Sequence, residues 1–191
     1  SAAEHRGTSA EQQDHCFAAT MEIKKRKIGI AVVADGVSAS GPKARPASGT
    51  AMSVFVDCLN ECLTAPGVRR THRFVEDCMM RALVAATFSV VRNVLLDFNN
   101  NGEFDAEDAA LLKAELGVDV PIGSVPIDEV NALVPVLEPV IEAVRAEGLS
   151  AQTTFCAALT LGSHLYTLNV GDSVAGLYRP GQGFVHLTSR D

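Results

Sequence analysis

The sequence predicts an α+β fold in which strands at both ends of the chain flank a helical middle. Residues 15–21 and 27–34 form two apolar segments joined by a basic turn, and both are expected to be strands. Between residues 47 and 95, apolar side chains recur at every third or fourth position, the spacing of one face of an amphipathic helix. From residue 153 onward, short apolar segments alternate with glycine-containing turns, which indicates an antiparallel meander.

The N-terminal elements follow from local patterns. Residues 28–34 are almost all apolar, so a strand buried on both faces is expected there. A first helix is predicted over residues 47–63, and Ala65-Pro66-Gly67 ends it. A second, longer helix is predicted over residues 74–95.

Shorter elements are expected in the C-terminal half. A helix over residues 109–116 should end at Gly117, which is a common helix stop. A second helix over residues 127–146 contains Pro135 and Pro139, so it should be kinked or split. The last four strands are predicted over residues 153–161, 164–169, 174–178 and 184–187.

Composition limits the classes of protein to consider. The 191 residues suffice for one domain, or for one domain with an insertion. The net charge of -7 gives no reason to expect a nucleic-acid or membrane partner, and we find no signal peptide or membrane-spanning segment. The five cysteines are odd in number and lack a Cys-x-x-Cys pair, so we expect reduced thiols, mostly buried, and a cytoplasmic location. The chain begins without methionine, which is compatible with a piece of a longer protein.

The segment from Asp97 to Asp108 has the spacing of a twelve-residue calcium-binding loop of the EF-hand type. Glycine at Gly102 stands where such loops turn sharply, and Glu103 is expected to offer its backbone carbonyl. We therefore predict a Ca²⁺ site here, although a polar turn that binds no ion is the alternative. The side chains expected to supply oxygen ligands are those of Asp97, Asn99, Asn101, Asp105 and Asp108.

One residue departs from the common calcium-loop pattern. Asp108 is the last ligand, where most such loops have a longer, bidentate glutamate. With Asp108 and the apolar residues 109–112 that follow it, the segment resembles the loop of dockerin modules. Only three of the side-chain ligands are carboxylates, so moderate calcium affinity is expected. No second loop of this kind is found, which argues against a calcium-sensor switch.

Three separated motifs indicate a second site. Gln12-Gln13-Asp14 stands at the head of the first predicted strand, and Asp35-Gly36-Val37-Ser38 follows the second. The third motif begins at Thr153-Thr154-Phe155 and continues to Asn169-Val170-Gly171-Asp172-Ser173. In this order the motifs resemble the protein phosphatase 2C family of metal-dependent serine/threonine phosphatases, and most of all its bacterial branch. The resemblance covers residues 7–64 and 150–191.

This resemblance implies a β-sandwich flanked by helices. Residues 1–96 and 150–191 would form part of the phosphatase core, and residues 97–149 would be an inserted helical segment. It also implies two Mn²⁺ or Mg²⁺ ions that activate water to hydrolyse phosphoserine or phosphothreonine in a protein substrate.

The family's site residues map onto four positions of this sequence. By resemblance, Asp14 and Asp35 are catalytic, with Asp35 bridging the two ions. Gly36 would offer its carbonyl to a metal, and Asp172 would help to hold a further metal. The competing interpretation is that these residues are ordinary turn and cap residues.

Two departures from the family bear on activity. The family usually carries a phosphate-binding arginine five residues before its first aspartate, whereas Ser9 stands here and Arg6 is out of register. The family's remaining metal-binding aspartates would follow Asp191, so we expect a C-terminal remainder and negligible turnover by this chain alone. Two hypotheses stay open: the N-terminal portion of a phosphatase, or a catalytically incomplete phosphatase-like module that binds calcium or a partner. A free dockerin-like domain fits less well, because the loop is not duplicated.

Overall fold

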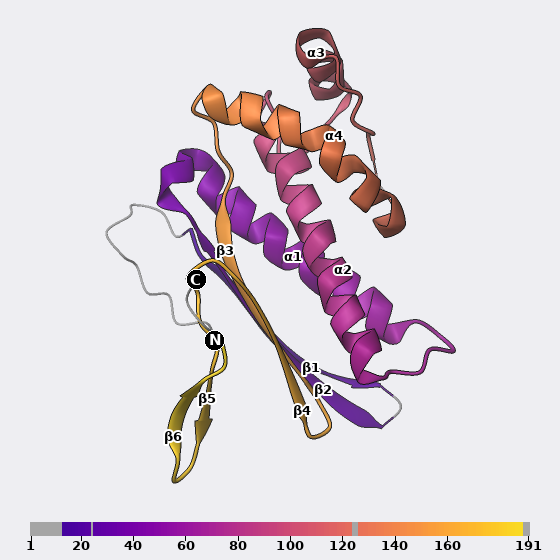
Figure 1. The fold of residues 1–191 in the computed structure, drawn as a ribbon, viewed down its shortest axis with the longest axis vertical. Coiled ribbons are helices and arrows are strands. Elements are labelled where there is room, and N and C mark those ends of the chain that lie inside the picture. Colours follow the sequence, from indigo (N-terminus) through magenta and orange to yellow (C-terminus); the bar gives the residue numbers. More distant parts are fainter. Residues whose placement is uncertain (1–12, 24, 124–125, 189–191) are drawn as a thin grey trace.

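A computed structural model describes residues 13–188, except residue 24 and residues 124–125. Several side chains between residues 127 and 136 are also left undescribed. The described part has a sheet layer and a helical layer (Figure 1). The sheet contains β1 (His15–Ile23), β2 (Arg26–Gly36), β3 (Thr153–Leu161) and β4 (His164–Val170), in that spatial order. All three neighbouring pairs are antiparallel, so the N-terminal hairpin and the C-terminal hairpin form one sheet. This mixed arrangement confirms the α+β prediction.

Two long helices lie on one face of this sheet. After the 3₁₀-helix η1 (Ser38–Lys43), α1 (Ala44–Thr64) packs on β2 and β3, and α2 (His72–Val90) packs on α1. The side chain of Thr71 caps α2 by accepting a hydrogen bond from the amide of Phe74. α2 then continues into the π-helix η2 (Val91–Leu95), which leads directly into the loop at Asp97.

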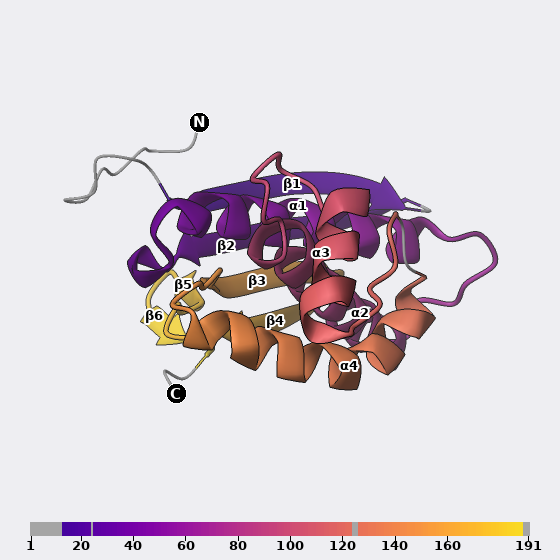
Figure 2. The same ribbon diagram turned by 90° about the horizontal axis from the view of Figure 1, so that it is seen from above.

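The remaining helices lie together at the end of the helical layer distant from the β1–β2 hairpin (Figure 1, Figure 2). They are α3 (Ala106–Leu116) and α4 (Ile127–Ala146), and α4 packs on α2. Gly117, in the left-handed conformation with a φ of 68°, ends α3 as predicted. α4 runs without interruption through Pro135 and Pro139, so the expectation that the prolines split this helix is wrong.

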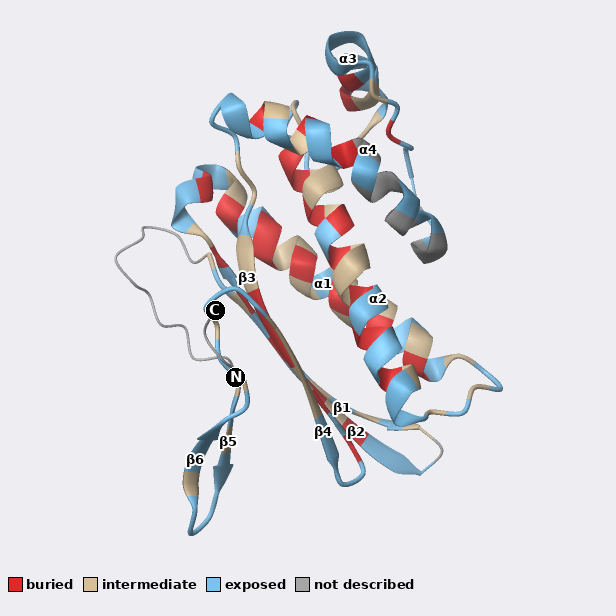
Figure 3. Ribbon diagram, in the orientation of Figure 1, coloured by how far each residue is buried: buried red, intermediate tan, exposed pale blue. Residues whose placement is uncertain are grey.

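The main hydrophobic core lies between the sheet and α1 and α2 (Figure 3). Alternate residues of β2 are buried there, whereas Val33 on the opposite face is 47% exposed. The prediction that this strand is buried on both faces is therefore wrong. An all-apolar strand does not reveal which faces will be covered, and in this chain helices cover only one face.

A second hydrophobic cluster lies around the end of α2 and the segment that follows it. It is separate from the main core and joins residues of α2, η2, the loop, α3 and α4, among them Phe88, Leu96, Phe104, Leu112 and Val140. Phe104, from the loop, is buried within it. The segment from residue 97 onward thus packs against the end of α2 and η2 in a shared apolar cluster.

Two further expectations need correction. The C-terminal strands do not form one meander, because β5 (Gly176–Arg179) and β6 (Gly183–His186) pair only with each other in a separate two-stranded sheet. All five cysteines are free thiols, as expected, but only Cys78 and Cys156 are buried, and Cys16 is exposed.

No helix in the described part of the chain is long and apolar enough to cross a membrane.

Candidate metal centre

The register of the first hairpin brings two predicted site residues together. His15 pairs with Ala34, so Asp14 and Asp35 lie opposite each other just beyond this pair. A hydrogen bond joins their carboxyl groups, and it is the largest cause that raises the pKa of Asp35 to about 6. Partial burial and the negative charges of Asp14 and Asp172 raise the same pKa further. Negative charge therefore accumulates at this end of the sheet.

Contacts from the start of α1 hold the strand that carries Asp14. The buried hydroxyl of Ser48 donates to the backbone carbonyl of Gln13 and also contacts Nδ1 of His15, 2.9 Å away. Burial is the main cause that lowers the pKa of His15, and the charge of Arg45 adds to it while that of Asp14 opposes it. The strand end therefore stays fixed beside Asp35.

Gly36 is required by close packing at the end of β2. A Cβ atom at this position would lie 2.7 Å from the carbonyl oxygen of Ala44 and 2.8 Å from that of Gln13, which is closer than non-bonded atoms allow. Neither neighbour is a flexible side chain, so a larger residue would displace the backbone. The glycine thus lets the strand that carries Asp35 approach both β1 and the start of α1.

Asp172 reaches the same end of the sheet from the β4–β5 connection. Asp35 pairs with Thr154 across β2 and β3, and the Thr154 hydroxyl lies 2.5 Å from the hydroxyl of Ser173. Asp172, the residue before Ser173, acts on Asp35 through its charge. The structure thus places Asp14, the adjacent residues Asp35 and Gly36, and Asp172 at the same end of the sheet, although they come from three separated segments of the sequence.

The donor set at this end fits a hard divalent cation. It consists of carboxylate and carbonyl oxygens, and the raised pKa of Asp35 shows that its negative charge is poorly compensated by the protein. Among the described residues, no group of three histidine, cysteine, aspartate or glutamate side chains comes close enough to hold a metal ion.

The calcium-type loop is organised by hydrogen bonds to its own backbone. Asp97 is 5% exposed, and its two carboxylate oxygens accept the amides of Asn101 and Gly102 at 3.1 and 2.9 Å. The side-chain oxygen of Asn99 also accepts from Asn101, and that of Asn101 accepts from Glu103. The first half of the loop is thus a set of tight turns around the buried Asp97 carboxylate.

The second half of the loop forms the start of α3. Asp105 caps the helix by accepting the amides of Glu107 and Asp108, and these bonds are the main causes that lower its pKa. The carboxylate of Asp108 is fully buried and accepts the amides of Phe98 and Asp105. All the predicted side-chain ligands lie in one compact loop, where backbone and amide N–H groups occupy their oxygens.

Lys43 contacts the start of the calcium-type loop, and sequence analysis missed it. Its ammonium group donates to the carbonyl oxygens of Val94 and Asp97, at 2.5 and 2.9 Å, and its burial lowers its pKa. Lys43 belongs to η1, which begins three residues after Asp35. Ser48 was also missed, although a hydroxyl residue within the apolar stripe of α1 could have indicated it. Nothing in the sequence pattern singles out Lys43.

Comparison with known protein families matches residues 2–191 to protein phosphatase 2C. Because this match covers nearly the whole chain, the chain belongs to the protein phosphatase 2C family. The family consists of phosphatases that generally use Mn²⁺ or Mg²⁺. No curated protein matches the chain. Four positions named in the sequence analysis, Arg6, Ser9, Gln12 and Asp191, lie outside the described residues.

Proposed function

We propose that this chain is the N-terminal portion of a serine/threonine protein phosphatase whose divalent metals bind at the end of the sheet. The observation that carries this proposal is the hydrogen-bonded pair Asp14 and Asp35, with Asp172 adding negative charge nearby. In this proposal Asp35 and the Gly36 carbonyl contact Mn²⁺ or Mg²⁺, Asp14 helps to orient the site, and Asp172 serves a further metal.

The chain's own residues would prepare this site for a phosphorylated protein. Bound metals would supply a water-derived nucleophile and neutralise charge on the phosphoryl group. Ser48 holds the start of β1 in place, and the Thr153 hydroxyl donates to the backbone carbonyl of Asp35 at 2.9 Å. These contacts fix the two acids before a substrate arrives, which is the usual requirement for efficient phosphoryl transfer.

Further carboxylates are needed to complete the proposed site. The described residues bring no three metal-ligating side chains together, so the ions would be held weakly by this chain alone. We propose that a C-terminal remainder of the protein supplies these ligands, and that the 191-residue chain by itself shows negligible turnover.

The test uses the full-length gene product and a phosphothreonine peptide with Mn²⁺. Asp35→Ala should lower turnover by about 100-fold, the upper end of the roughly 10–100-fold loss expected when the support of a metal site is removed. Asp57→Ala, which removes an exposed carboxylate on α1, is the matched control and should leave turnover unchanged. Metal-dependent turnover by the Asp35→Ala protein at the wild-type rate would overturn the proposal.

We also propose that the loop from Asp97 to Asp108 binds Ca²⁺ with moderate affinity, within an inserted segment comprising residues 97–149. The loop spacing and the buried Asp97 carboxylate support this proposal. Calcium would have to compete with the N–H groups that now bond to Asp97, Asp105 and Asp108, which lowers the net gain from binding.

Thermal unfolding with and without calcium tests this second site. Calcium should raise the Tm of the wild-type chain, since a ligand that binds only the folded state stabilises it. Asn101→Ala should reduce the calcium-dependent rise, whereas Asn60→Ala on the exposed surface of α1 should leave it unchanged. An identical Tm with and without saturating calcium would contradict a calcium site in the loop.

The alternative function is a phosphatase-like module that binds calcium or a partner without catalysis. The same full-length product distinguishes it, because a binding module would show a calcium-dependent rise in Tm and no turnover. A cytoplasmic location is part of the proposal and is supported by the five free thiols.

A further inference from the structure

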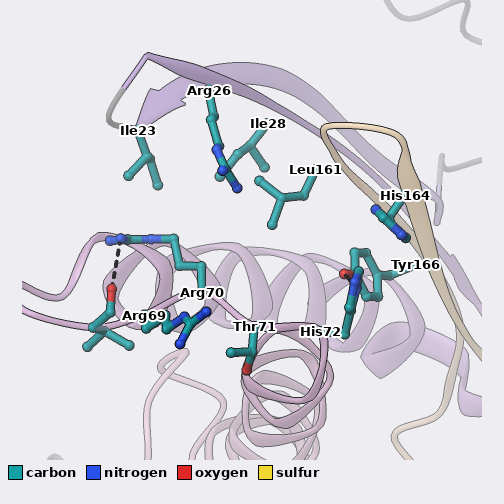
Figure 4. A pocket seen from close by; sticks show the side chains of 11 residues that line it. Ile23, Arg26, Ile28, Arg69, Arg70, Thr71, His72, Leu161, His164 and Tyr166 are labelled. Carbon is teal, nitrogen blue, oxygen red and sulfur yellow. Dashed lines mark hydrogen bonds between the residues drawn. The ribbon is translucent and has the colours of Figure 1, made fainter.

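A concave site lies at the end of the sheet opposite to Asp35. It is a cavity of about 670 Å³, bounded by the β1–β2 hairpin, the β3–β4 hairpin and the connection between α1 and α2 (Figure 4). The first hairpin runs from the pair His15–Ala34 to the pair Ile23–Arg26, so the cavity is roughly 25–30 Å from the acids. Its volume is typical of pockets that bind small molecules.

Three arginines line this cavity, and two of them have unused hydrogen-bond donors. Arg70 donates to the carbonyls of Leu63, Val68 and Ala65 and so caps the end of α1. Arg26 on β2 and Arg69 in the α1–α2 connection are exposed, and the guanidinium group of neither forms a hydrogen bond or ion pair with any residue that the structure describes. Two guanidinium groups are therefore available to an anion.

An apolar wall and an aromatic cluster complete the cavity. Figure 4 shows Arg26, Ile28 and Leu161 pointing from the sheet toward the α1–α2 connection. On another side, the ring centroids of His72 and His164 lie 4.1 Å apart. Nδ1 of His72 lies 2.5 Å from the hydroxyl oxygen of Tyr166. The cavity thus combines cationic donors with a surface that an apolar group can cover.

We propose that this cavity binds a small organic phosphate. Arginine presents a planar fork of donors that matches phosphate oxygens, and two such groups suit a phosphate dianion better than a single carboxylate. The phosphate would contact Arg26 and Arg69, and its organic part would lie against Ile28 and Leu161. The chain carries a net charge of -7, so two free arginines in one cavity are a local exception. Glu76, whose charge acts on Tyr166, is an opposing acid near this site.

Phenylphosphonate is a suitable probe, because its P–C bond is not a substrate for phosphate-ester hydrolysis. Binding is measured by calorimetry with EDTA present, which removes metal-dependent binding at the acidic end of the sheet. Phenylphosphonate should bind more tightly than benzoate, which has the same ring, and more tightly than inorganic phosphate. Equal affinity for benzoate would contradict the claim that the cavity prefers a phosphate group to a carboxylate. Equal affinity for inorganic phosphate would contradict the claim that an organic group contributes to binding.

Two variants locate the binding. Arg26→Gln and Arg69→Gln should each weaken phenylphosphonate binding at least about tenfold, as expected when a charge-assisted hydrogen bond is lost. Arg179→Gln, at an exposed arginine of β5, is the matched control and should bind like the wild type. If neither pocket variant changed the affinity while both remained folded by circular dichroism, the proposal would be wrong.

Histidine ring resonances provide an independent readout. On titration with phenylphosphonate, the signals of His72 and His164 in the cavity should shift, whereas that of His15 at the opposite end should stay constant. A shift of His15 alone would place the ligand at the acidic end and contradict the proposal. This test does not depend on phosphatase activity, so its outcome is separate from that of the proposed function.

Discussion

The two acidic regions of this chain use the same residue type in opposite ways. At the end of the sheet, Asp14 and Asp35 bond to each other, and the pKa of Asp35 rises to about 6. In the loop, backbone amides donate to Asp97, Asp105 and Asp108, and such bonds lower the pKa of Asp105. One region therefore has negative charge that the protein leaves poorly compensated, whereas the other satisfies its carboxylates internally.

This difference shows whether the carboxylates already have partners within the protein, which the spacing of a sequence motif does not reveal. The loop has the clearer sequence motif, yet its carboxylates already have structural partners. The acids at the sheet end come from three separated segments, and a cation there would relieve the repulsion between them. We therefore expect a cation to change the local charge balance more at the sheet end, where the sequence motif is weaker, than in the loop.

The largest expected effect is on stability, in the loop. Asp108→Ala removes a fully buried carboxylate that accepts the amides of Phe98 and Asp105, and leaves both donors without this partner. We expect the free energy of unfolding to fall by about 2–4 kcal/mol, measured by urea denaturation. Glu107→Ala at the exposed neighbouring position should change it by less than about 0.5 kcal/mol. Equal effects of the two substitutions would show that the loop does not depend on its carboxylates.

A smaller loss of stability is expected at the sheet end. Gly36→Ala places a Cβ atom against the backbone carbonyls of Ala44 and Gln13, so the strand end must shift. The expected cost is about 1–3 kcal/mol by the same measurement, with Ser38→Ala as the control because its hydrogen bond to Gln13 is exposed. An unchanged free energy of unfolding in Gly36→Ala would contradict the close packing that positions Asp35.

The smallest expected effect is a gain in stability at neutral pH when the Asp35 carboxylate is replaced. In the metal-free chain, the raised pKa of Asp35 means that its protonated form is the one favoured by folding. This contribution is complete below the unfolded pKa near 3.8 and is lost as the pH rises through about 6. Asp35→Asn cannot ionise, so at neutral pH its Tm should exceed that of the wild type. The difference should vanish at about pH 4. A lower Tm for Asp35→Asn at neutral pH, without metal, would show that the ionised carboxylate is favourable there.

Periodicity and turn residues predicted the elements themselves well. The two N-terminal strands, the two long helices and the helix end at Gly117 all lie close to their expected positions. The opposition of Asp14 and Asp35 was not itself predicted, but it results from the predicted hairpin, whose register pairs the two strand ends. The sequence did not predict that only one face of β2 is buried, because this depends on which face of the sheet the helices occupy.

The supports of the site were beyond prediction for a different reason. Ser48 contacts Gln13 from 35 residues away, and Lys43 contacts Asp97 from 54 residues away. A local pattern carries no information about such pairs, which form only when the helices pack on the sheet. Likewise, β5 and β6 have the alternation of a meander, but their separation from β4 is decided by tertiary packing.

The most direct test of a metal centre at the sheet end is paramagnetic broadening by Mn²⁺ in the isolated chain. His15 is adjacent to Asp14, whereas His72 and His164 lie at the other end of the sheet. We predict that Mn²⁺ broadens the ring resonances of His15 first and that Asp35→Ala removes this selectivity. Equal broadening of all three histidines, or none at His15, would contradict a metal site at Asp14 and Asp35.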